Sequence, residues 1–275
     1  MKQLFTTRGI VAGAVITVLC STVATAHHSW RKYHWATTTG IVSLEVGDNV
    51  DTNWDTHLSV AVSDWSLSSN LDLTKVPGRT NPATCAPTAG RIETCNGSYG
   101  NNGWLGIAQI WIQGSAHIYQ ATTRLNDTYF NTATYNTPAW RQLVTCQEVG
   151  HDFGLDHQDE RNNNVNLGTC MDYTNDPDGF AGGASPSDPS NEHPNQHDYD
   201  QLASIYSHRD STNTAGASTA SRAAARPEAA DWGQLVRTSP DNRVQTYERD
   251  LGNGNRVVTH VFWADPEGDA KPGRR

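Results

Sequence analysis

Residues 147–157 read Gln147-Glu148-Val149-Gly150-His151-Asp152-Phe153-Gly154-Leu155-Asp156-His157, and this stretch decides both the fold and the chemistry. On a helix, positions 147 and 151 are one turn apart and project from the same face, so both side chains can reach one metal ion. Glu148 lies beside them, where it can act on a water molecule instead of binding the metal. Gly154 lets the chain turn back, which brings His157 to the same ion. Three protein ligands with an open position for water form a hydrolytic zinc site.

The helix that carries this stretch has a clear start and a clear end. Thr137 can cap it, and Pro138 suits the first helical position. One face then carries a stripe formed by Trp140, Leu143, Val144, Gln147 and His151. Gly154 can take the left-handed conformation that ends a helix. The pattern predicts a helix that begins at Pro138 and stops before Gly154.

Gln147 has two interpretations. On a buried stripe its amide must find a partner, since an unsatisfied amide costs roughly 1–3 kcal/mol. A metal ion would satisfy the amide oxygen, and because that oxygen is a neutral, harder donor than imidazole, zinc would be held less tightly. In the other interpretation, Gln147 only hydrogen-bonds inside the domain, and the site is a degenerate one kept as a scaffold.

The motif resembles that of the metzincin zinc metallopeptidases, which is H-E-x-x-H-x-x-G-x-x-H followed by a methionine-containing turn. Gln147 stands here in place of the first histidine, and Cys170-Met171-Asp172-Tyr173 supplies the turn. The upstream order of strand, helix with Trp54 and Trp65, and further strands is similar to a matrixin-like catalytic domain. The resemblance covers about residues 35–210.

The resemblance implies an α+β fold with a twisted, mostly parallel sheet, an edge strand at the cleft, an active-site helix and a methionine turn. We place the edge within residues 104–125, where an extended peptide substrate would pair as an added strand. The family's pattern implies Zn²⁺ held by Gln147, His151 and His157. Gly154 shapes the turn between the last two, and Met171 lies beneath the metal.

The function that this resemblance implies is that of a secreted zinc-dependent metalloendopeptidase. A metal-activated water would hydrolyse the peptide bond, with Glu148 as general base and Tyr173 helping to stabilise the oxyanion. The alternative is a non-catalytic pseudoprotease that binds peptides or matrix material outside the cell. The substitution at Gln147 favours this alternative, whereas Glu148, which catalysis needs and the fold does not, argues against it.

The cysteines predict disulfides. Cys85, Cys95, Cys146 and Cys170 follow residue 26, and an even number in an oxidising compartment favours bridges over metal binding by thiolates. Three pairings are possible. We favour Cys85–Cys95, which closes a short loop. The resemblance brings the neighbourhoods of Cys146 and Cys170 together under the metal and so favours a second bridge there; the alternative is a buried free thiol at Cys146.

The first twenty-six residues predict export. Lys2 and Arg8 precede an apolar run over 10–19, and the stretch closes on Ala24-Thr25-Ala26, as in a secretory signal peptide. The run is about half the roughly twenty residues that cross a bilayer. Its removal takes the formal charge from −9 to about −11. Since acidic chains are poor partners for nucleic acid and anionic membranes, we expect neither among its partners, and a protein or peptide as substrate.

Beyond the signal peptide at 1–26, the chain divides into a catalytic domain over 27–210, a low-complexity linker over 211–230 and a tail over 231–275 that looks like a β-hairpin. Within the domain, spacing predicts strands at 40–46, 71–73, 104–112 and 117–125, helices over 54–65 and 198–206, and a loop over 76–103.

Some further residues could bind metal but are better explained otherwise. Asp172, Asp176 and Asp178 are interpreted as solvated loop acids, with calcium binding as the alternative. His117, His193 and His197 are expected to be surface or structural residues.

Overall fold

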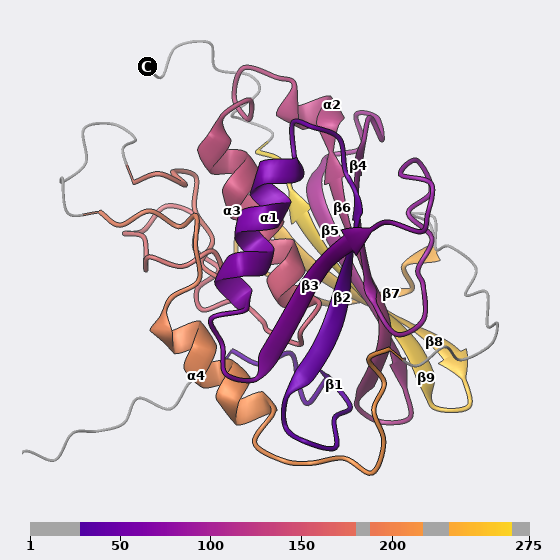
Figure 1. Ribbon diagram of the computed structural model, residues 1–275. Coiled ribbons are helices and arrows are strands. Elements are labelled where there is room, and N and C mark those ends of the chain that lie inside the picture. The colour runs from indigo at the N-terminus through magenta and orange to yellow at the C-terminus, as the bar shows by residue number, and fades with distance from the viewer. Residues whose placement is uncertain (1–27, 180–187, 217–230, 266–275) are drawn as a thin grey trace, which may run out of the picture.

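The computed structural model describes residues 28–179, 188–216 and 231–265 of the chain. The predicted signal peptide at 1–26 and most of the predicted linker lie outside the described residues. The fold is α+β, with one mixed sheet and helices packed against it (Figure 1). The strands are β1 (His34–Trp35), β2 (Val42–Asn49), β3 (Leu71–Pro77), β4 (Ile92–Gly97), β5 (Trp104–Gln113), β6 (His117–Asn126), β7 (Gln234–Thr238), β8 (Val244–Gly252) and β9 (Asn255–Trp263). The helices are α1 (Asp55–Trp65), α2 (Asp127–Phe130), α3 (Pro138–His151) and α4 (Gln196–Ile205).

The sheet runs in the order β3-β2-β4-β6-β5-β9-β8-β7, with β1 also paired to β6. Pairings from β3 to β6 are parallel, and those from β6 through β5 to β7 are antiparallel. The expected mostly parallel sheet is therefore only the N-terminal half of a mixed one. The tail supplies the other half, because β7, β8 and β9 extend the sheet of the domain.

The predicted edge within residues 104–125 is wrong. β5 pairs with β6 on one side and with β9 on the other, from Trp104 opposite Trp263 to Ile112 opposite Arg256. β5 is buried along almost its whole length. Apolar periodicity locates a strand but does not name its neighbour, and here the neighbour is about 150 positions further along the chain.

Strand β4 was missed inside the predicted loop 76–103. Its sequence is polar, yet it lies between β2 and β6. Glu93 on this strand is fully buried, where its carboxylate lies 3.2 Å from Arg91 Nε and accepts a hydrogen bond from Asn49 at 2.7 Å. A charged residue that is paired inside the protein carries no apolar signal in the sequence.

Helices α1 and α3 pack together on one face of the sheet (Figure 1). The Thr137 side chain accepts a hydrogen bond from Trp140 N, so the predicted cap of α3 is confirmed. Trp65 of α1 donates from Nε1 to Cys146 O at 3.0 Å. A methyl group on Gly150 would lie 2.7 Å from both Trp65 and the Met171 sulfur. The glycine therefore lets α1 and the methionine turn approach the centre of α3.

Two bridges are present, Cys85–Cys95 and Cys146–Cys170, in the pairing that the sequence favoured. The second ties α3 to the segment before Met171. Residues 211–216, the start of the predicted linker, pack on the domain, where Thr214 exchanges hydrogen bonds with Ala36. Within 28–179, 188–216 and 231–265, no helix is long and apolar enough to span a bilayer.

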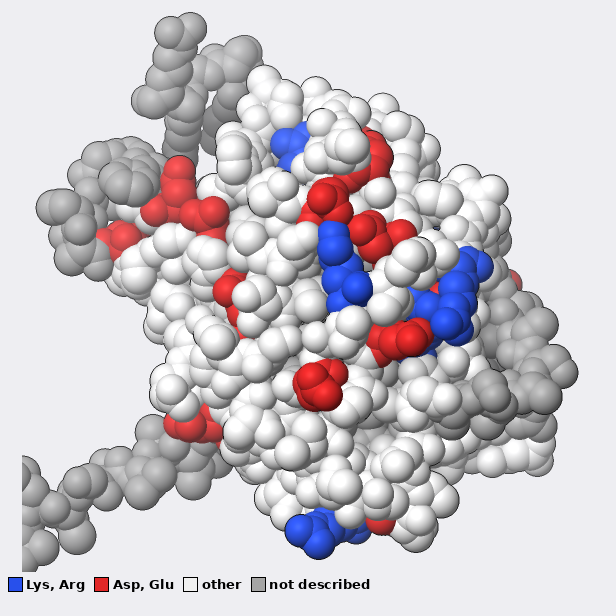
Figure 2. Space-filling model, in the orientation of Figure 1, with Lys and Arg blue, Asp and Glu red and all other residues white. Residues whose placement is uncertain are grey.

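The face seen in Figure 2 carries basic and acidic side chains side by side. Lys75 contacts Asp48 and Asp55, and Arg79 and Arg91 both contact Glu45. The charges of Lys75, Arg79 and Arg91 are therefore compensated locally.

Candidate metal centre

His151 ends α3, and His157 follows the turn at Gly154. That turn requires glycine for two reasons: φ is +91°, and a Cβ would lie 2.0 Å from the Tyr33 carbonyl oxygen. The Gly154 carbonyl in turn accepts a hydrogen bond from Trp30 N at 2.7 Å. The segment before β1 therefore holds the turn in the shape that directs His157 back to α3.

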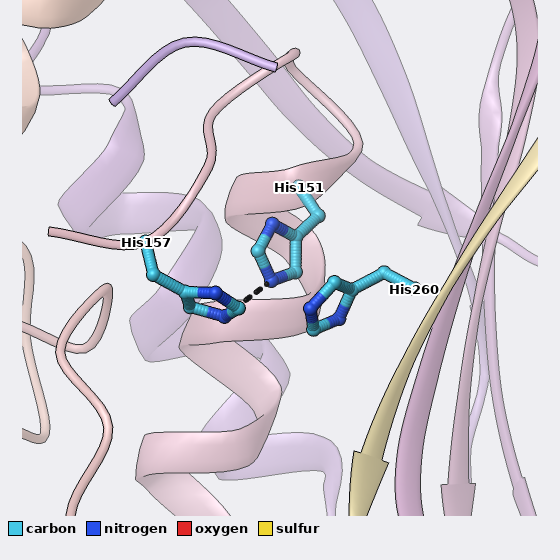
Figure 3. A group of neighbouring side chains, drawn as sticks. All are labelled: His151, His157 and His260. Carbon is cyan, nitrogen blue, oxygen red and sulfur yellow. Dashed lines mark hydrogen bonds between the residues drawn. The ribbon is translucent and has the colours of Figure 1, made fainter. Parts of the chain in front are cut away.

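The two imidazoles meet at their Nε2 atoms, which are 3.1 Å apart (Figure 3). The Leu155 carbonyl accepts at 2.8 Å from His151 Nδ1, which fixes the proton on that nitrogen and leaves a lone pair on Nε2. Burial, and then the neighbouring His157, hold the pKa of His151 well below its usual range, so its ring is neutral. Two nitrogen ligands of a tetrahedral zinc ion, each about 2.0–2.1 Å from it, stand about 3.3 Å apart, so this pair fits the ion.

A third imidazole, that of His260 on β9, completes the cluster and was not among the predicted site residues. Its ring centroid lies 3.9 Å from that of His151 and 4.7 Å from that of His157. The ligand nitrogens of the three residues all lie within 4.8 Å of one another. Burial, followed by the two neighbouring histidines, lowers the pKa of His260 well below its usual range. The cluster therefore presents three imidazole rings from three separate segments, as Figure 3 shows.

The general base predicted at Glu148 lies beside this cluster and is fully buried. Its Oε2 is 3.7 Å from His260 Nδ1, and within the described parts of the chain no side chain donates a hydrogen bond to either carboxylate oxygen. Burial raises the pKa of Glu148 well above its usual range, and the charge of Asp152 adds to this. The carboxyl group is thus poised to take up a proton and faces the histidines.

Gln147 is also fully buried. Its amide nitrogen donates to the Cys170 carbonyl at 2.8 Å, which ties α3 to the methionine turn next to the disulfide. Its Oε1 has no hydrogen-bond partner among the described residues. A metal-ligand role for that oxygen stays a prediction.

Tyr173 lies next to His157, with ring centroids 5.2 Å apart. Its hydroxyl donates to the Arg243 carbonyl at 2.9 Å, and burial raises its pKa well above the usual range. The group predicted to stabilise an oxyanion is therefore hydrogen-bonded to the chain just before β8.

The remaining candidates have other partners. His117 contacts Asp210 at 3.2 Å, and His193 contacts Asp64 at 2.6 Å. His197 stacks on His28. Of the loop acids, Asp172 and Asp176 are buried rather than solvated, and Asp172 accepts hydrogen bonds from Leu167 N and Asn191. The Asp172 carboxylate takes the place of a backbone acceptor for Leu167 N inside the loop, and an aspartate in such a role looks the same in the sequence as a solvated one.

Comparison with known proteins gives weak structural likenesses. No family model matches the chain, and no curated protein matches it significantly. The chain is similar to high choriolytic enzyme 1, a hatching enzyme zinc-protease from Oryzias latipes, at 11% identity and a TM-score of 0.34, covering 64% of this chain and 95% of that one. Two structures of myroilysin align at 11% and 10% identity, with TM-scores of 0.33 and 0.32, covering 65% and 66% of this chain and 84% and 89% of theirs. Likenesses at these scores carry no inference about function, which therefore rests on the site itself.

Proposed function

We propose that this chain is a secreted, zinc-dependent metallopeptidase of the metzincin type. The observation that carries the proposal is the meeting of His151 Nε2 and His157 Nε2 at 3.1 Å, fully shielded from solvent, beside the carboxyl group of Glu148. Several buried polar atoms near this point have no hydrogen-bond partner among the described residues, including Gln147 Oε1 and both nitrogens of His260. Unsatisfied buried groups of this kind are rare in folded proteins, and a bound cation would satisfy the acceptors Gln147 Oε1 and one ring nitrogen of His260.

When bound, zinc would lower the pKa of a water molecule and polarise a scissile carbonyl. Glu148 would accept the proton of the attacking water at its carboxylate and pass it to the leaving amine. The Leu155 carbonyl would keep the His151 proton on Nδ1, so that Nε2 offers its lone pair. The shielding from solvent strengthens these electrostatic interactions, because the local dielectric constant is low.

The proposed hydrolysis requires that a peptide substrate can reach the site. All four central side chains, those of Glu148, His151, His157 and His260, are at most 5% exposed, and β9 occupies the side of β5 on which a peptide would pair. A substrate and β9 cannot use the same backbone groups of β5. We therefore propose that the closed arrangement is latent, and that hydrolysis follows displacement of the hairpin formed by β8 and β9.

A second candidate is the non-catalytic binding protein. The same closure favours it, because a permanently covered site would hold metal without turning over a substrate. The two candidates differ in what an opened protein does.

The test is to open the hairpin in the full chain, by the Phe262→Ala change developed in the Discussion, and to assay peptide hydrolysis with zinc content. Glu148→Gln in the opened protein should abolish hydrolysis and leave the zinc in place, whereas the matched surface change Glu192→Gln should preserve both. Hydrolysis that survives Glu148→Gln would remove the assignment of the base. An opened, zinc-loaded protein without activity on any peptide of a diverse library would favour the binding protein.

A further inference from the structure

We propose that His260, on the C-terminal hairpin, is the third histidine ligand of the metal and takes the place that Gln147 leaves without an imidazole. The inference rests on the metal site of the proposed function and deepens it. It assigns part of the metal centre to a segment about a hundred residues beyond the motif.

The register of β9 places His260 over α3. Along β9, His260 is opposite Ala108 of β5, and alternate residues point to opposite faces of the sheet. Val258 and Phe262 share the face of His260 and pack into the main core, whereas Val261 packs with Trp104 on the other face. A slip of one residue would turn His260 away from α3, so the register of the whole strand, and not any single neighbour, sets the direction of its side chain.

The histidine cluster is better satisfied by a cation than by hydrogen bonds. The proton of the His151 ring lies on Nδ1, so its Nε2 can only accept. The contact between the two rings is then a hydrogen bond that His157 donates from Nε2–H to His151 Nε2. That account leaves both nitrogens of His260 without a hydrogen-bond partner among the described residues, although the ring is 1% exposed. A neutral imidazole is the commonest metal ligand in proteins, and an ion shared by the three rings would bind one of the two His260 nitrogens.

The position of Gln147 agrees with this assignment. Its amide nitrogen is committed to the Cys170 carbonyl, where it connects α3 to the methionine turn. Histidine supplied by β9 would restore three imidazoles, a set typical of zinc sites. Displacement of the hairpin would then remove a ligand as it uncovers β5, which opens a position at the metal.

The experiment measures zinc affinity of the full, disulfide-bonded chain by competition with a chelating dye. His260→Ala should weaken zinc binding on the order of a hundredfold or more, since changes even to groups that only orient ligands cost about 10–100-fold. Val258→Ala is the matched control, because it removes packing from the same face of β9 and leaves every donor in place. Its zinc affinity should stay close to that of the wild type.

A second measurement needs no substitution in the protein observed. In wild-type chain labelled at histidine, zinc titration should shift the ring nitrogen signals of His151, His157 and His260 together in NMR spectra, with each ring signal assigned through its bonds to the backbone of its own residue. This measurement keeps the inference testable if His260→Ala fails to fold.

The outcomes separate the inference from the function on which it rests. If His151→Ala and His157→Ala abolish zinc binding and His260→Ala matches Val258→Ala, or if only the first two rings shift, the assignment of His260 is overturned and the metal site stands. If His151→Ala binds zinc as the wild type does, the metal site of the proposed function fails.

Discussion

Truncating Phe262 tests whether the hairpin is a removable cover. Phe262 is fully buried on β9, two residues from His260, and its ring packs 4.3 Å from that of Tyr173 and 6.4 Å from that of Trp140, measured between centroids. Both partners belong to the domain rather than to the hairpin. Phe262→Ala therefore removes contacts that exist only while β9 lies on β5.

The size of the effect follows from this burial. A fully buried Phe→Ala change costs about 3–5 kcal/mol. If the domain stays folded when the hairpin detaches, the whole loss of free energy shifts the equilibrium between the docked and the detached hairpin. At about 1.4 kcal/mol for each factor of ten, the open population should rise between about a hundredfold and a few thousandfold.

Amide hydrogen exchange of β5 and peptidase activity report this opening. Amides of β5 that donate to β9 should lose protection in the variant, whereas amides between β2 and β4 keep theirs, and peptide hydrolysis should rise with the open population. Leu251→Ala is the matched control, since Leu251 lies on the same hairpin but is 38% exposed, so its truncation should change neither readout.

If β5 and the parallel strands of the variant lose amide protection together, the hairpin and the domain unfold as one unit, and the hairpin is not a separate cover. Selective loss of protection on β5 without any gain in hydrolysis, in zinc-loaded protein, would refute latency and leave the closed site a binding site.

Three further predictions concern stability and the position of the base. Replacing Cys146 and Cys170 by Ser opens a bridge between residues 24 positions apart and should lower the free energy of unfolding by roughly 3 kcal/mol, measured by urea titration; an unchanged midpoint would contradict it. Burial raises the pKa of Asp172 to about 6, so the folded state keeps this proton to a higher pH than the unfolded chain does. The stability that this group supplies, up to about 3 kcal/mol, is thus present below its unfolded pKa and lost as the pH rises through about 6. Asp172→Asn should remove this pH dependence of the free energy of unfolding. If the unfolding free energies of the two proteins change in parallel from acid to neutral pH, the assignment is refuted. Gly106→Ala would place a methyl group 2.7 Å from Glu148 Oε1 and should cost about 1–3 kcal/mol while lowering activity of the opened protein at constant zinc content; full activity would show that the carboxyl group has room to move.

Local signals carried most of what the sequence predicted correctly. Thr137 and Pro138 start α3 as expected, and the apolar spacing from Trp54 to Trp65 marks α1. These features depend on residues within one or two turns of each other, where capping and periodicity act. The sequence pattern did not predict strand β4, because Glu93 is buried through its contacts with Arg91 and Asn49, and apolar periodicity does not reveal such contacts.

His260 could have drawn attention in the sequence, because it is the one ionisable residue in the apolar stretch 257–263. A lone histidine among strand residues is more often structural than a ligand, so this signal is weak without its neighbours. The sequence predicted Gln147 itself as the third donor, and nothing in the spacing of the motif points to His260.

The sequence by itself determined the start of α3 at Thr137 and Pro138, the turn at Gly154 and the placement of Gln147, Glu148 and His151 on one helix, since each follows from contacts that are close along the chain. Only the tertiary structure decided that β9 lies on β5, that the site is closed, and that His260 faces His151 and His157. Strand pairing depends on backbone groups that all residues share, and its partner is selected by packing over the whole sheet. For that reason the segment that covers the histidine cluster was visible as a hairpin in the sequence, while its place in the molecule was not.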